Sequence, residues 1–166
     1  MSKINIKLSD FKTINTDGSQ ITVCYGLKQV SGDIYECQEV VLPKTQHNQL
    51  TFDVVKEAII SDINKRVKTA IISGFVWNEK PVWLSEENQL NFSQAVVPAT
   101  LKIGEQEDGT PIYETFDTKT TLKAFNDACS LWRQQCLSEG YSEKDGIDWT
   151  PYEALFPEPT KTETTE

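Results

Sequence analysis

Residues 71–97, IISGFVWNEKPVWLSEENQLNFSQAVV, determine how the rest of the chain is organised. Two apolar segments, each with a Val-Trp pair, flank a polar run at residues 78–80, a pattern typical of a β-hairpin. We therefore predict strands over residues 69–77 and 81–84. Gly74 inside the first strand indicates a bulge or a close contact.

The polar half of the same stretch predicts a helix over residues 86–96. Ser85 precedes two glutamates. A serine oxygen caps free backbone N–H groups, and acids suit the positive end of the helix dipole. Pro98 restricts the residue before it, so we expect the helix to end there.

Upstream of this stretch, apolar residues recur at spacings of three and four. They predict one stripe of an amphipathic helix over residues 52–67, formed by Phe52, Val55, Ile59, Ile63 and Val67.

The first part of the chain has the period of β-strands instead. Residues 3–8 alternate between polar and apolar, which predicts a half-buried strand. Residues 20–27 and 34–42 flank a turn and predict an antiparallel hairpin, which Pro43 ends because proline donates no hydrogen bond to a strand ladder.

Downstream, residues 99–103 and 112–116 flank the turn sequence Asp108-Gly109-Thr110 and predict another hairpin. The clearest helix follows over residues 118–139. Its apolar side chains have 3-4-3-4 spacing and predict core packing; they are Leu122, Phe125, Cys129, Trp132 and Cys136.

The ends of this helix are also marked in the sequence. Asp117 or Thr118 is the expected cap at its start, and Gly140 is the expected stop.

These elements predict an α+β fold. An antiparallel sheet in residues 1–45 precedes a helix, hairpin, helix, hairpin, long helix module in residues 51–140. Residues 141–156 are expected to pack back as a loose C-terminal arm. Residues 157–166 contain no apolar residue beyond proline and are expected to be a disordered acidic tail.

The net charge of −9 arises after residue 50, where 20 acids stand against 11 basic residues. Such a surface repels phosphates, so we expect no nucleic-acid partner. The sequence also contains no apolar run of about 20 residues, so we expect no membrane association.

The four cysteines and the single histidine do not predict a metal site. The cysteines form no C-x-x-C pair, and His47 is the only histidine. Cys24 and Cys37 lie on strands expected to pair, where a disulfide would need an oxidising compartment. We expect free thiols, and core packing for Cys129 and Cys136.

Catalytic motifs are also missing. The sequence has no phosphate-binding loop, and a Ser-His-Asp triad would need His47, which lies in a polar linker. Paired carboxylates remain as acid-base candidates: Glu86 with Glu87, and Glu105 with Glu107 and Asp108. We predict that the protein is not an enzyme and takes no cofactor and no small-molecule substrate.

Large aromatic residues are abundant for a chain of this size. A small domain is expected to leave some of them near its surface, where aromatic patches mark protein interfaces. The candidate interface residues are Tyr25, Tyr35, Trp77, Trp83 and Trp149.

The order of elements over residues 72–90 resembles a small domain family of unknown function that is common in phages and prophages of Bacteroidales. The resemblance rests on Val82-Trp83-Leu84-Ser85 followed by a polar helix, then a hairpin and a long helix with aromatic and cysteine positions. It covers about residues 51–140. Members look like short proteins encoded among phage structural genes, often near tail or fibre genes, and the family has no activity to carry over.

The resemblance implies a virion structural or adaptor protein, in the tail, a fibre or a head appendage. It would be made in the host bacterial cytoplasm and carried in the virion, in contact with other virion proteins and as a homo-oligomer. Two alternatives stay open: a cytoplasmic phage protein that binds and inhibits a host protein, and a carbohydrate hydrolase that uses two carboxylates.

Overall fold

The computed structural model describes residues 4–7, 12–14, 19–43 and 50–156. The predictions for His47 and for the tail, residues 157–166, lie outside these residues. The chain is α+β, as predicted, and divides into two compact units. Unit 1 comprises Met1–Ile63 and Glu143–Glu166, and unit 2 comprises Asn64–Ser142.

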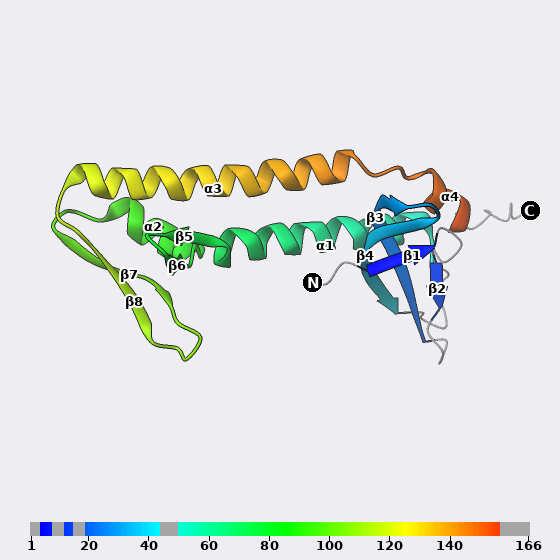
Figure 1. The fold of residues 1–166 in the computed structure, drawn as a ribbon, viewed down its shortest axis with the longest axis horizontal. Helices are drawn as coiled ribbons and strands as arrows, with labels where there is room; N and C mark the ends of the chain where they lie inside the picture. The colour runs from blue at the N-terminus through cyan, green and yellow to red at the C-terminus, as the bar shows by residue number, and fades with distance from the viewer. Residues whose placement is uncertain (1–3, 8–11, 15–18, 44–49, 157–166) are drawn as a thin grey trace, which may run out of the picture. The chain divides into compact units, whose positions relative to one another are not determined.

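Unit 1 is built on an antiparallel sheet with the strand order β1-β4-β3-β2 (Figure 1). Its strands are β1 (Ile4–Lys7), β2 (Lys12–Ile14), β3 (Gln20–Ser31) and β4 (Ile34–Pro43). The predicted β3–β4 hairpin is confirmed, and β4 ends at Pro43 as expected. Ser31 pairs with Ile34, so the turn contains only Gly32 and Asp33, and the positive φ of Gly32 (50°) suits a tight turn.

Two helical segments belong to unit 1. They are the first half of α1 (Phe52–Ser73) and the short helix α4 (Thr150–Leu155). Both contribute to the interior, since Val55, Ile59, Tyr152 and the adjacent Phe156 are buried. The predicted C-terminal arm therefore includes a helical turn with two buried rings.

Unit 2 contains the second half of α1, two hairpins and two further helices (Figure 1). Its remaining elements are β5 (Phe75–Trp77), β6 (Lys80–Val82), α2 (Glu86–Gln94), β7 (Ala99–Glu105), β8 (Pro111–Phe116) and most of α3 (Lys119–Asp145). Both predicted hairpins are present. Figure 1 shows β7 and β8 as a long two-stranded ribbon.

The prediction of a strand from residue 69 was wrong, because α1 continues to Ser73. Its last turn is held by Ser73 Oγ, which donates to Thr69 O at 2.9 Å, and by Gly74 N, which donates to Ala70 O at 2.9 Å. Gly74 therefore lies directly after α1 and not inside a strand, and it is a position of close contact. A Cβ there would lie 2.8 Å from the ring of Trp132.

The prediction that Gly140 ends the long helix was also wrong. Gly140 is buried inside α3, which continues to Asp145. A Cβ on Gly140 would lie 2.5 Å from Cγ2 of Val67 on α1. The glycine therefore serves close helix packing within unit 2 and does not terminate the helix.

The core of unit 2 is organised around Phe125 of α3, which is fully buried. Its ring centroid lies 5.0 Å from Phe116, 5.1 Å from Phe92 and 5.4 Å from Trp77. These distances are in the range of favourable aromatic pairs. The predicted seam on α3 is confirmed at Leu122, Phe125, Cys129 and Cys136, while Trp132 is half-buried.

The helix starts in unit 2 agree with the sequence. Ser85 Oγ accepts a hydrogen bond from Asn88 N at 3.2 Å, as predicted for the cap of α2. Thr118 Oγ1 accepts from Thr121 N at 3.2 Å, so Thr118, one of the two candidates, caps α3. None of the described helices combines the length and apolarity that crossing a membrane requires.

Candidate functional site

An open groove of about 1050 Å³ lies within unit 2, lined by α1, α2, α3 and Leu84. On α1 its lining residues follow one helical stripe: Asn64, Val67, Lys68, Ile71 and Ile72. On α3 they follow another: Asn126, Cys129, Ser130, Arg133, Gln134 and Leu137. Spacings of three and four keep each set on one face of its helix, so two parallel stripes border the same space.

Deeply buried apolar side chains form part of the lining. Leu84, Phe92 and Cys129 all reach the groove, although each is at most 9% exposed. Leu90 on α2 contributes an apolar side chain that remains 54% exposed. The exposed leucine beside this apolar lining leaves an apolar surface that a further apolar group can cover.

Hydrogen bonds between the lining helices fix the groove. Trp132 Nε1 donates to Ala70 O at 3.1 Å and joins α3 to α1. Asn126 Nδ2 donates to Phe92 O at 3.1 Å and joins α3 to the end of α2. Because both acceptors are backbone carbonyls, these bonds set the spacing of the helices themselves, so the groove is formed before any partner arrives.

The charged lining residues are Lys68, Arg133 and Glu86, so the lining carries a net positive charge in a chain whose net charge is −9. Arg133 Nη1 donates to the Gln89 side chain at 3.4 Å. Within the described residues neither Lys68 nor Arg133 forms a salt bridge. Both charges therefore remain available to a carboxylate.

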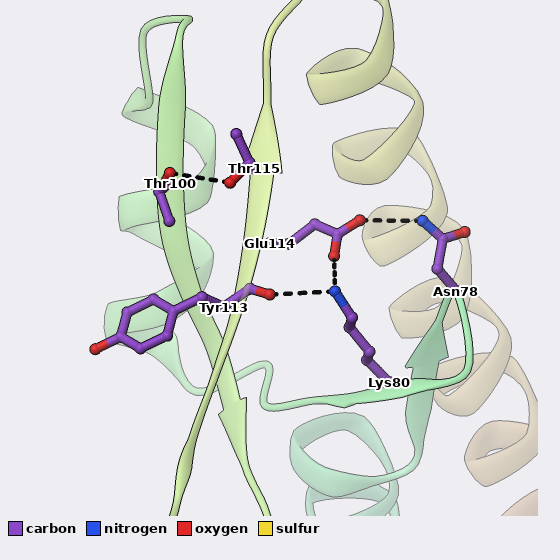
Figure 2. A network of polar contacts seen from close by, with 6 residues as sticks. All are labelled: Asn78, Lys80, Thr100, Tyr113, Glu114 and Thr115. Carbon is purple, nitrogen blue, oxygen red and sulfur yellow. Dashed lines mark hydrogen bonds and ion pairs between the residues drawn. The ribbon is translucent and has the colours of Figure 1, made fainter.

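A second polar cluster lies where the β5–β6 turn meets β8 (Figure 2). The carboxylate of Glu114 accepts from Lys80 Nζ at 2.5 Å and from Asn78 Nδ2 at 3.1 Å, and Lys80 also donates to Tyr113 O. The Lys80 ammonium is the main cause that holds the pKa of Glu114 below its ordinary value. Each partner is satisfied within the cluster, so we assign it a structural role.

The β5–β6 turn that presents this cluster is a two-residue turn, shorter than the predicted polar run. Trp77 pairs with Lys80, and Asn78 and Glu79 both have positive φ, at 48° and 64°. This is the conformation of a type I′ hairpin turn, whose twist matches that of its strands. It aims the Asn78 amide at Glu114.

The five aromatic residues predicted to form an interface are divided between the units, and none lines the groove. Tyr25 is fully buried and donates a hydrogen bond to Asp62 at 2.5 Å, so it offers a partner no surface. Tyr35 is half-buried, and so is Trp149, whose ring lies 6.1 Å from Phe52. These three belong to unit 1.

The other two belong to unit 2. Trp83 is 39% exposed and is the most exposed of the five residues. Trp77 is half-buried against Phe125. Its buried indole N–H lacks a hydrogen bond of normal geometry to the described part of the chain, yet helps to lower the pKa of Glu114.

Most of the groove residues were not predicted from the sequence, because the two stripes combine apolar and polar side chains. The α3 stripe alternates leucine and cysteine with asparagine, serine and arginine, and therefore has no apolar period. The available signal was a second 3-4 spacing beside the apolar seam.

The candidate carboxylates lie at exposed or half-buried positions. Among the described residues no charged side chain is buried, and no cluster of His, Cys, Asp or Glu has the arrangement of a metal site. Glu86 and Glu87 are exposed in the first turn of α2, and Glu105 pairs with Lys102 at 2.5 Å.

All four cysteines are free and buried. Burial raises the pKa of Cys24 and of Cys129 to about 12, and it also raises the pKa of Cys37 and Cys136. Thiolates are the reactive form, so these groups are poor nucleophiles in the folded protein.

Comparison with known proteins adds no further constraint: no family model, no curated protein and no solved structure matches this chain.

Proposed function

We propose that the protein acts through protein contacts, as a structural or adaptor component of a phage particle. The groove of unit 2 is the observation that carries the contact function. It offers a partner an apolar surface, an exposed leucine and two accessible cations, on helices joined by side-chain hydrogen bonds to backbone carbonyls.

The phage context is supported by the resemblance in residues 72–90 and by the mapping of the long helix onto α3. The groove supports the proposal, because it is a surface that another particle protein could contact. Particles are assembled from repeated protein contacts, and a small chain that presents a preformed groove suits such an assembly.

The test is to purify the particles of the phage that encodes this chain and to quantify the protein in them by mass spectrometry. We expect it at a copy number comparable with other structural proteins. The variant Leu90→Lys places a charge in the groove and should be depleted from particles. Leu131→Lys is the matched control, because Leu131 is 63% exposed on α3 and does not line the groove.

Two results would contradict the proposal. The first is a protein abundant in infected cells but missing from particles, which would favour an inhibitor of a host protein. The second is equal incorporation of the Leu90→Lys and Leu131→Lys variants, which would remove the groove from the contact.

A further inference from the structure

Resting on the contact function proposed above, we infer that the groove binds one amphipathic helix of a partner protein. That helix presents apolar side chains at positions i, i+3 or i+4, and i+7, and carries carboxylates on its flanks. The apolar stripe faces Leu84, Leu90 and Phe92, and the carboxylates face Lys68 and Arg133.

The length and form of the groove fit a helix. The α3 stripe runs from Asn126 to Leu137, which spans about 16 Å at 1.5 Å per residue. A helix of about three turns covers that distance. Binding of an amphipathic helix between exposed helical faces is a common recognition mode, anchored by residues at these same spacings.

The charges of the groove lining determine which residues we expect on the flanks of the partner helix. Lys68 lies on α1 and Arg133 on α3, and both are exposed. Glu86 on α2 is the opposing charge in the lining. A helix with acids toward α1 and α3 would pair with both cations, and arginine in particular binds a carboxylate with two parallel hydrogen bonds. A basic helix would meet like charge on two sides.

The same features argue against other occupants. A symmetric contact between the grooves of two copies would bring together two linings that each carry a net positive charge. Two concave surfaces also cannot fill each other. A volume of about 1050 Å³ lies at the upper end of small-molecule pockets, which are usually more enclosed.

The experiment is a selection from a displayed library of 18-residue helical peptides. Each peptide carries leucine at i, i+3, i+7 and i+11, and its flanking positions are randomised between glutamate and lysine. The baits are the full-length protein, the double variant Lys68→Glu with Arg133→Glu, the variant Leu90→Lys and the control Leu131→Lys. Thermal unfolding establishes that each bait is folded.

We expect glutamate-flanked peptides to be enriched at least about tenfold over lysine-flanked ones on the wild type and on Leu131→Lys. The double variant should reverse that preference. Leu90→Lys should weaken the best peptide by about tenfold or more, a change that calorimetry measures directly as a shift in Kd.

Equal enrichment of both flanks, or a preference that survives the double charge reversal, would overturn the inference. So would a wild-type dimer in light scattering that Leu90→Lys converts to a monomer, because a second copy would then be the occupant. The outcome is separable from the particle test. If the protein is incorporated in particles but shows no charge preference for peptides, this inference is wrong and the proposed function stands.

Discussion

Unit 1 and unit 2 bury aromatic rings in different ways. In unit 1 the buried rings of Tyr25 and Tyr152 end in hydroxyls that donate to specific acceptors. These are the Asp62 carboxylate at 2.5 Å and the Cys24 carbonyl at 2.8 Å. In unit 2 the central ring, Phe125, has no polar atom and contacts three other rings.

The difference shows two ways to orient elements. A tyrosine hydroxyl ties one helix to one strand at a defined point, since a buried donor without an acceptor is costly. A phenylalanine hub orients its neighbours only through shape and ring geometry, and several elements depend on it together. We therefore expect truncation of the hub to cost more than removal of a single hydroxyl.

The largest effect is expected for Phe125→Ala, which should lower the free energy of unfolding by about 3–5 kcal/mol. The loss has two parts: the transfer of the ring and the cavity left among Trp77, Phe92 and Phe116. Urea denaturation measures the total, and hydrogen exchange should show loss of protection in unit 2. Phe125→Leu, which fills most of the space, should cost clearly less. Equal costs would contradict this expectation, because refilling the space would then recover no stability and the ring contacts, not simple burial, would account for the loss.

Gly104→Ala should follow, with a loss of about 2 kcal/mol. A Cβ at this position would lie 2.5 Å from the backbone oxygen of Pro81, and backbone cannot move aside as a side chain can. The contact joins the two hairpins of unit 2, where Trp83 N also donates to Ile103 O at 2.7 Å. Glu107→Ala, at an exposed position between β7 and β8, is the control, and a similar melting temperature for both variants would rule out this close approach.

Tyr152→Phe tests unit 1 and should cost about 1 kcal/mol, the usual net value of one hydrogen bond. The ring stays buried, and the change removes the hydroxyl with its bond to the Cys24 carbonyl. Tyr113→Phe, at an exposed ring, should leave the melting temperature unchanged. A loss as large as that of Phe125→Ala would erase the contrast between the two units.

The smallest effect concerns the Lys80–Glu114 pair and its dependence on pH. The pKa of Glu114 is lowered in the folded state, so its contribution is fully present above the unfolded value of about 4.3. It is lost as the pH falls through the lower folded value. Lys80→Met should cost at most about 1 kcal/mol at pH 7 and flatten the acid side of the stability profile. An unchanged profile would show that the pair is not coupled to folding.

Sequence could predict the elements whose signal is local. The cap at Ser85, the hairpin around Gly109 and the seam from Leu122 to Cys136 depend on neighbours within one or two turns, and all are present. Each was therefore predictable from residue type and spacing alone.

The sequence-based predictions were wrong where a residue distant in the sequence determines the local structure. Gly140 indicates a helix end by its own propensity, but contact with Val67, 73 positions earlier in the chain, makes it a packing position. The helical state of residues 69–73 and the groove depend in the same way on tertiary neighbours. The groove also has no apolar period in its sequence, since its stripes combine Lys68 and Arg133 with leucine and isoleucine.

The four buried cysteines can be used to measure local opening of the folded protein. Cys24 and Cys37 belong to unit 1, and Cys129 and Cys136 belong to unit 2. Because burial suppresses the thiolate in all four, a thiol reagent can modify a cysteine only while the structure around it is open. Timed alkylation followed by peptide mass analysis would thus give separate opening rates for the two units in the unmodified chain, without any engineered probe.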